Sequence, residues 1–392
     1  MMNPTYRWSI SFLLTVICFV AMINSLSAQD DPGKSKKHDK EVFKDTLDGM
    51  FDFSSFLIDS KGFIPIPIII TEPALGNIGA VLCLAFFTPK EIPEGQKYVA
   101  PDITAGLGMY TANKSWAAGG GRIGSFPKRG IKYRAFAGYA GLNLSFYRTP
   151  PMADDEREYK FNIKALPVLL SLSKALPKTD LYLGGQYTFA NSTLDPLFTD
   201  ELPDGITEDD LDSQTGSLGI FFDWDRRDNF FTANKGTILH VLYTVDDEWT
   251  GSDYSYQRMN GLLNWFYPIK ENWISGLRIE AQHAFDDPPF YLLPSLAMRG
   301  VPLARYQGAT TALIETEQRI DLNRRWSVVA FGGLGKAIMR DQDFDDAETV
   351  YNFGTGFRYL IARAFGLRTG IDIAKGPDNF AWYIVFGHNW NR

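Results

Sequence analysis

The chain has 392 residues, of which 22% are charged, and a formal net charge of −7 at pH 7. Phosphate binding needs clustered Lys and Arg, so this balance argues against a nucleic-acid partner. Aromatic residues make up 14% of the chain, and there are 35 glycines. Beyond the N-terminal region no apolar run reaches 18 residues, so the sequence predicts no membrane-spanning helix there.

Residues 1–28 have the pattern of a secretory signal peptide. One arginine precedes an apolar run from Trp8 to about Ile23, and small residues follow as far as Ala28. The apolar run is shorter than the roughly 20 residues of a spanning helix, which favours a cleaved leader over the alternative of a membrane anchor. Cleavage would leave Cys83 as the only cysteine, so we expect an exported chain stabilised by its sheet or core rather than by a disulfide.

Residues 29–62 are predicted to be a periplasmic linker or a short amphipathic helix. Between Lys40 and Leu57, apolar residues recur near helical spacing. A helix here would plug or cap the periplasmic end of the domain that begins at residue 63. The alternative is a disordered linker. The apolar residues are Val42, Phe43, Leu47, Met50 and Phe51.

From residue 63 to residue 392 the sequence alternates between apolar and polar positions. In residues 347–360, for example, Phe353 and Phe357 share one parity, and Asn352 and Arg358 share the other. Successive side chains of a strand face opposite ways, so each segment has one apolar and one polar face. A soluble β-sandwich gives the same alternation. Long segments, aromatic residues near their ends and charged polar faces favour a transmembrane β-barrel.

Sixteen such segments are predicted, an even number, as closed antiparallel bacterial barrels normally have. If the first strand rises from the periplasm, the odd-numbered connections are external and include several long ones, whereas several of the even-numbered connections are short. The exception is the long stretch "DRRDNFFTANKG". The predicted segments are 64–72, 77–88, 98–111, 115–126, 131–147, 159–173, 180–191, 213–225, 237–247, 252–268, 272–285, 309–322, 325–337, 347–360, 365–375 and 380–390. We therefore expect an all-β, 16-stranded antiparallel barrel of the bacterial outer membrane.

Several motifs resemble the bacterial surface antigen barrel of the BamA/TamA outer-membrane assembly superfamily. They are the sixth external loop "SLAMRGVPLARYQG", the Asp-x-Arg-Asp-Asn segment "FFDWDRRDNFFTANKG", the strand pair "LIETEQRIDLNRRWSVVAFGGLGKA" and the late segment "GTGFRYLIARAFGLRTGIDIAKG". "FIPIPIIITEPALGNIGA" is similar to the family's Pro-rich first strand. The barrel-motif residues that the resemblance selects are Asp225, Arg227, Asp228, Gly236, Arg319 and Arg358.

The resemblance implies that the sixth loop tucks into the barrel lumen and is held there by its arginine. Arg299 and Gly300 match the family's Arg-Gly pair, and Val301 stands where an aromatic residue is usual. Glu317 is the expected acceptor; the family's second acceptor position holds Gly333, and Asp372 is the expected substitute. The alternative is a solvated loop arginine, which the apolar residues around Arg299 argue against.

The C-terminal residues resemble the aromatic signal by which such barrels are recognised for insertion. Trp382, Ile384, Phe386 and Trp390 share one parity, with Trp390 in the role of the terminal aromatic. The family's assembly proteins also carry periplasmic POTRA domains, and residues 29–62 are too short for even one of them.

No enzyme, metal or cofactor is predicted. The four histidines are scattered, no metal-ligand spacing occurs, and no serine sits in a nucleophile elbow. Three functions remain: a barrel that aids protein or lipid assembly or translocation through a seam between its first and last strands, a passive porin-like channel, and a structural surface antigen. The expected partners are outer-membrane lipids, with unfolded outer-membrane proteins or a separate periplasmic POTRA-type or chaperone partner as further candidates. The proline pair Pro65 and Pro67 supports the seam, because each proline removes a ladder donor.

Overall fold

The computed structural model describes residues 43–59, 63–88, 90, 102–148, 156–177, 179–199, 202–203 and 206–390. The predicted signal peptide, residues 1–28, lies outside the described residues, as does the first part of the predicted linker. The chain divides into two compact units, Met1–Asp59 and Ser60–Arg392. Among the described residues, no helix is both long enough and apolar enough to cross a membrane.

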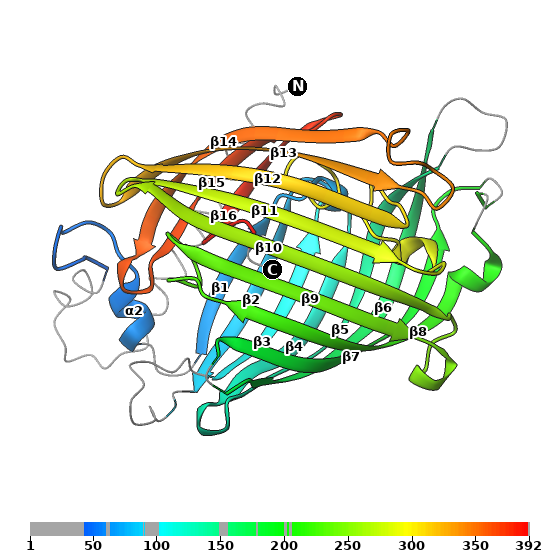
Figure 1. Cartoon of the computed structure of the whole chain (residues 1–392), viewed down its shortest axis with the longest axis horizontal. Helices are drawn as coiled ribbons and strands as arrows, with labels where there is room; N and C mark the ends of the chain where they lie inside the picture. The colour runs from blue at the N-terminus through cyan, green and yellow to red at the C-terminus, as the bar shows by residue number, and fades with distance from the viewer. Residues whose placement is uncertain are drawn as a thin grey trace, which may run out of the picture. The chain divides into compact units, whose positions relative to one another are not determined.

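In the described part of the second unit, sixteen strands form one antiparallel sheet in sequence order, from β1 (blue) to β16 (red) in Figure 1. Alternating, β-branched and aromatic-rich sequence produces each strand, and short turns between most of them produce the up-and-down order. The predicted 16-stranded antiparallel barrel is therefore confirmed. The strands are β1 (Phe63–Ile70), β2 (Gly79–Thr88), β3 (Asp102–Thr111), β4 (Trp116–Phe126), β5 (Ile131–Arg148), β6 (Arg157–Ala175), β7 (Leu181–Pro196), β8 (Asp212–Asp225), β9 (Gly236–Asp246), β10 (Tyr256–Lys270), β11 (Trp273–Ala284), β12 (Thr310–Asp321), β13 (Trp326–Ile338), β14 (Thr349–Ala362), β15 (Leu367–Lys375) and β16 (Phe380–Phe386).

The two faces of the barrel wall differ as the alternation predicts. On β12, Glu315 and Glu317 face inward and are buried. The preceding residue of the same strand, Ile314, faces outward and is exposed. Outward aromatic residues contact one another across strands, as Trp326 and Tyr359 do with ring centroids 4.9 Å apart. An exposed apolar outer face with aromatic residues near strand ends is what a hydrocarbon environment requires.

The connections at the two ends of the barrel differ in length. At one end, the long-loop end, β5, β7, β11 and β13 are followed by long connections. At the other, the short-turn end, most turns are tight: β4 and β14 are each followed by one turn of 3-10 helix that a left-handed glycine ends, Gly130 and Gly366, both with φ +63°. Glycine adopts this conformation without the steric cost that a side chain brings.

The first and last strands approach one another without pairing. No backbone ladder joins β1 to β16 among the described residues, although the two strands lie close together. Pro65 and Pro67 both lie in β1 opposite Leu84 and Leu82 of β2. Residues of the same parity present their backbone groups to the same edge, so both missing N–H donors weaken one edge of β1. Because no ladder joins the described residues of β1 and β16, the barrel wall has a seam between these two strands.

Of the N-terminal unit, residues 43–59 are described. Among them α2 (Ser54–Asp59) is the only helix, and residues 43–52 form a hairpin-like turn in which Lys44 bridges to Phe51. The carboxylates of Asp45, Asp48 and Asp52 each accept a backbone N–H two residues later. Such local bonds compete with helix formation, so residues 43–52 are not helical although their apolar residues recur near helical spacing.

Candidate functional site

Loop six, residues 285–309 between β11 and β12, inserts one arginine among inward-facing carboxylates. Arg299 is 3% exposed, and its Nη1 donates to Glu317 Oε2 at 2.7 Å and to Asp372 Oδ2 at 2.8 Å. Its guanidinium carbon lies 3.4 Å from the centre of the Phe331 ring on β13. The structure thus brings together Arg299, Glu317 and Asp372, including the substitute acceptor that the sequence indicated.

The backbone next to Arg299 fits closely against the long-loop end of β15 and β16. Gly300 has φ +82°, and its N–H donates to the Tyr383 hydroxyl of β16 at 2.8 Å. A Cβ on Gly300 would lie 2.7 Å from the backbone nitrogen of Gly376. Both the backbone conformation and the lack of space therefore require glycine after Arg299.

The charge on Arg299 is stabilised by its surroundings. Burial by itself would lower the pKa of Arg299, but the carboxylates of Glu317, Asp372 and Glu315 outweigh it and raise that pKa. Two of its nitrogens, Nε and Nη2, have no hydrogen-bond partner among the described residues. The aromatic face of Phe331 covers this guanidinium, and a cation over an aromatic ring is favourable when both are removed from water.

Arg278 and Asn352 add further hydrogen bonds around Arg299, and the sequence analysis did not single out either residue. Arg278 on β11 donates to Glu315 and Glu280, and also to the backbone oxygen of Ala297 in loop six at 3.1 Å. Asn352 Nδ2 on β14 donates to the Arg299 backbone oxygen at 3.0 Å and to Glu315 Oε1 at 2.9 Å. Their place on the polar parity of each strand was visible in the sequence, but their meeting across four strands was not.

Crowding around Gly333 explains why the second acceptor position expected from the family resemblance holds no carboxylate. A Cβ at residue 333 would lie 2.5 Å from Glu315 Cγ and 3.0 Å from Asn352 Oδ1. The space that a residue-333 side chain would need is taken by Glu315. Asp372 instead supplies the second carboxylate to Arg299, and Arg358 on β14 holds Asp372 with both of its terminal nitrogens.

Loop six also reaches the opposite wall of the barrel. Phe290 packs on Phe146 of β5 and Phe161 of β6, with ring centroids 4.9 and 5.3 Å apart. Arg305 Nη1 lies 2.7 Å from Glu156 Oε2, just before β6. Loop six therefore crosses the long-loop end from β12–β15 to β5–β6, and on the β5–β6 side it makes both apolar and ionic contacts.

Turn eight, residues 226–235, is a ten-residue connection at the short-turn end, and its motif residues shape it. Arg227 Nε and Nη2 donate to Asp225 at 2.9 and 2.8 Å. Asp228 Oδ1 accepts the backbone N–H of Asn234 at 2.9 Å, which folds the turn back on itself. Gly236 starts β9 with φ +107°, and a Cβ there would lie 2.2 Å from the Arg226 oxygen.

Turn eight reaches strands that are distant in the sheet. The side chain of Asn234 accepts a hydrogen bond from Arg319 of β12. Asn229 Nδ2 donates to the backbone oxygen of Phe365, between β14 and β15, at 2.9 Å. The extra length that made this turn an exception to the expected asymmetry thus serves to span the short-turn end.

The C-terminal residues correct one prediction. β16 ends at Phe386, and Gly387, with φ +74°, turns the chain away, so Trp390 does not continue the strand as predicted. Trp390 is 2% exposed and clusters with Ala233 of turn eight and Phe266 of β10. Alternation over residues 380–390 suggested a longer strand because parity says nothing about where a chain turns. Trp382, Ile384 and Phe386 do lie on β16 with the predicted common parity.

His388 lies inside this C-terminal cluster. Its Nε2 is 3.5 Å from Glu317 Oε1. Burial lowers the pKa of His388 to about 4, despite the nearby Glu317 carboxylate. The imidazole is therefore neutral at pH 7, and the contact with Glu317 is not an ion pair at that pH.

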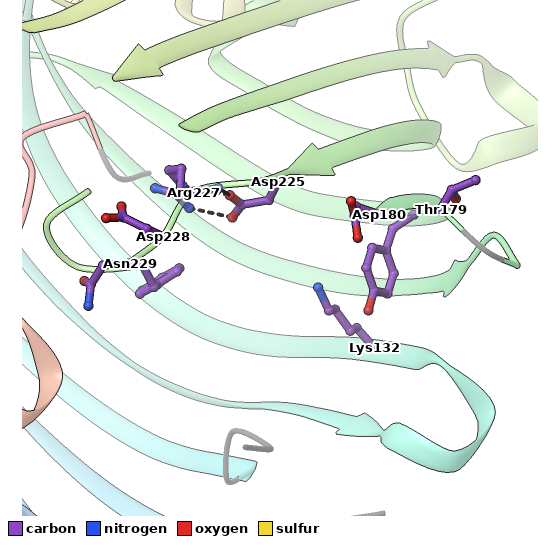
Figure 2. A pocket seen from close by; sticks show the side chains of 9 residues that line it. Lys132, Thr179, Asp180, Asp225, Arg227, Asp228 and Asn229 are labelled. Atoms are coloured by element: carbon purple, nitrogen blue, oxygen red, sulfur yellow. Dashed lines mark hydrogen bonds and ion pairs between the residues drawn. The ribbon is translucent and has the colours of Figure 1, made fainter. Parts of the chain in front are cut away.

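A polar hollow of about 370 Å³ opens beside turn eight (Figure 2). Lys132 from β5 and Asp180 before β7 face Asp225 and Arg227 across it, and dashed lines mark the Asp225–Arg227 pair. The Lys132 ammonium lies 3.6 Å from the centre of the Tyr182 ring. Two of the carboxylates that line the hollow are paired with arginines, Asp180 with Arg226 and Asp225 with Arg227. Among the described residues no group of three or more His, Cys, Asp or Glu is placed to hold a metal.

Comparison with known proteins gives likeness in structure alone. No protein-family model matches the sequence, and no curated protein matches it. BamA from Haemophilus ducreyi lacking POTRA domains 1–3 is similar with a TM-score of 0.56 and 11% identity, over 84% of this chain and 70% of that chain. CdiB from Escherichia coli gives 0.59 and 12%, over 84% and 63%, and CdiB from Acinetobacter baumannii gives 0.56 and 10%, over 84% and 60%.

This chain therefore has the fold of the BamA and CdiB barrels of the bacterial outer membrane. It spans less than two thirds of the length of the two CdiB chains. At 10–12% identity the likeness concerns the barrel and not the activity.

Proposed function

We propose that the protein is an outer-membrane barrel of the BamA/TamA type that aids insertion or translocation of proteins or lipids at its β1–β16 seam. The observation that carries the proposal is the missing ladder between β1 and β16 among the described residues. An unpaired strand edge offers backbone donors and acceptors to another strand. In this proposal the edge of β1 receives a client strand, and the short-turn end faces the periplasm.

The contacts at the two ends of the barrel support this function over a passive channel. Loop six crosses the long-loop end, and we infer that Arg299 holds it within the lumen through Glu317 and Asp372. Turn eight and the segment ending at Trp390 span the short-turn end. A solute that passes through the lumen would have to displace both sets of contacts. Insertion of a client at the seam would leave both sets in place. The proposal includes no catalytic step, and it allows a separate periplasmic POTRA-type or chaperone partner.

Site-specific photo-crosslinking tests the seam. A photo-reactive amino acid would replace Ile69, which is on the outward face of β1, and in a second variant Ile220, which is 64% exposed on the outward face of β8 within a complete ladder. The refolded barrel in liposomes is then mixed with a urea-unfolded outer-membrane protein. We expect faster client insertion than in empty liposomes, and client crosslinks at residue 69 but not at residue 220.

Each alternative has its own outcome. Equal crosslinking at the two positions, or no acceleration of insertion, would reject a seam insertase. Steady ion conductance of the unmodified barrel in a planar bilayer would favour the porin-like channel. Absence of both activities would leave the structural surface antigen.

A further inference from the structure

A charged cluster lies on the outward face of β3, β4 and β5. Register pairs Thr104 with Arg122 and Gly124 with Tyr133, so Asp102, Arg122 and Tyr133 all face the same side of the wall. That side also carries the exposed aromatic residues of the outer face, such as Tyr139, which is 46% exposed. Charged side chains on a lipid-facing surface destabilise a barrel except near the membrane interface. The depth and the partners of this cluster therefore decide whether it is tolerated.

The cluster is organised around one satisfied carboxylate. Asp102 Oδ2 accepts from Arg122 Nη2 at 3.1 Å and from the Tyr133 hydroxyl at 3.0 Å. Its Oδ1 accepts the Ser125 backbone N–H at 3.0 Å and lies 2.5 Å from Lys90 Nζ. Asp102 is 5% exposed, whereas the Arg122 side chain remains 43% exposed. The carboxylate therefore positions the arginine without covering it.

Gly124 gives this arrangement its space. A Cβ at residue 124 would lie 2.2 Å from Asp102 Oδ1 and 2.4 Å from the Tyr133 hydroxyl oxygen. The missing side chain lets Asp102 of β3 and Tyr133 of β5 meet across β4. A fixed geometry of this kind distinguishes the cluster from a chance ion pair between long, mobile side chains on a surface.

Further basic residues line the same edge of the barrel. Lys128 and Arg129 lie exposed in the turn between β4 and β5, and Lys174 is exposed on the outward face near the end of β6. The basic edge, as we name it, consists of Lys90, Arg122, Lys128, Arg129 and Lys174 together with Asp102. Five positive charges and one negative charge give it a net charge of +4, in a chain whose net charge is −7.

The position of the basic edge fits a membrane interface. Asp102 begins β3, Phe126 ends β4 and Tyr133 is near the start of β5, so the cluster lies at the short-turn end. Phe126 and Tyr133 stack in a tilted pair with centroids 5.5 Å apart beside it. Aromatic residues at this depth are typical of the girdle at the headgroup level, and basic residues there attract anionic lipids.

We propose that the basic edge binds the phosphate of anionic phospholipids in the membrane leaflet at the short-turn end. Arg122, held by Asp102 and Tyr133, and the exposed Lys174 supply the charged donors to the headgroup phosphate, and the aromatic pair contacts the glycerol region. The site goes beyond the proposed seam activity and does not depend on it. It would concentrate anionic lipid along the wall that begins two strands from the seam.

Native mass spectrometry of the full-length refolded barrel tests the proposal. The barrel is titrated with phosphatidylglycerol or phosphatidylcholine of identical acyl chains, and the ratio of the two apparent Kd values is the readout. A basic side chain near an anionic headgroup contributes a factor of about five. We therefore expect Arg122→Gln with Lys174→Gln to reduce the preference for phosphatidylglycerol by at least about fivefold.

The matched control removes two lysines from β6, the strand that carries Lys174. They lie on the same face of β6 but at its opposite end. Lys160 and Lys164 of β6 are both exposed and share the parity of Lys174. We expect Lys160→Gln with Lys164→Gln to keep the preference. An equal loss in both double variants, or no preference in the unmodified barrel, would overturn the proposal.

Two further measurements keep the test decisive. Heat-modifiable migration in cold gels checks that each variant is folded, and the single variant Lys174→Gln, at an exposed position, serves if the double variant fails to fold. We expect this single variant to lose part of the preference. Binding of inorganic phosphate as tight as that of phosphatidylglycerol would show a soluble-anion site and overturn the assignment to lipid.

Discussion

Replacing Arg299 with alanine removes the central cation of the loop-six contacts. Among the described residues Glu317 would keep the contact with His388 at 3.5 Å, whose imidazole is neutral at pH 7, and the charge of the nearby Arg358. Asp372 would keep both nitrogens of Arg358. Breaking a buried ion pair by removing one partner costs about 3–5 kcal/mol. Because one of the two carboxylates retains its partner, we expect a loss of about 3 kcal/mol in the free energy of unfolding.

The loss is measured by urea unfolding of the refolded barrel, followed by heat-modifiable migration in gels. Trypsin provides a second readout, because release of loop six exposes Arg305, whose side chain is now only 17% exposed. We expect Arg299→Ala to be cleaved there much faster than the unmodified chain.

Asp287→Ala is the control for this prediction. Asp287 also lies in loop six and pairs with Arg340 at 2.9 Å, but its side chain is 89% exposed. Exposed pairs contribute about 0–1 kcal/mol. A shift below about 1 kcal/mol for Arg299→Ala, with trypsin resistance unchanged, would refute the view that its buried ion pairs hold loop six.

Three further predictions concern residues around these contacts. Gly333→Asp, which creates the carboxylate expected from the family resemblance, should lower the refolding yield, since its Cβ would lie 2.5 Å from Glu315 Cγ; normal yield and stability would contradict this. Trp390→Ala should cost about 3–5 kcal/mol of stability, as loss of a buried aromatic does. If Trp390 acted only as an insertion signal, refolding and stability in detergent would be unchanged. The pKa of His388 is about 4 in the folded chain and about 6.5 when unfolded, so its neutral form contributes stability that is lost as pH falls from 6.5 towards 4. His388→Gln should show a weaker loss of urea resistance between pH 7.5 and 4.5, and an identical pH dependence would reject this assignment.

The sequence determined the barrel because alternation is a local property. Each segment shows its apolar and polar parity without knowledge of its neighbours, and short turns with glycine at Gly130 and Gly366 leave antiparallel pairing as the simple connection. The strand number and the asymmetry of the two ends follow from these local signals. The motif with Arg299 and Gly300 also indicated its acceptor Glu317, because that residue lies on the polar parity of the next strand.

What the tertiary structure decided depends on contacts between distant strands. Alternation cannot tell which polar side chains meet inside a barrel, so the link from Arg278 to loop six and the crowding of Gly333 by Glu315 appeared only in three dimensions. Parity also continues past a turn, which is why Trp390 was assigned to a strand and instead packs against turn eight. Local periodicity fixes which way a side chain faces, whereas its partner is fixed by how the sheet closes.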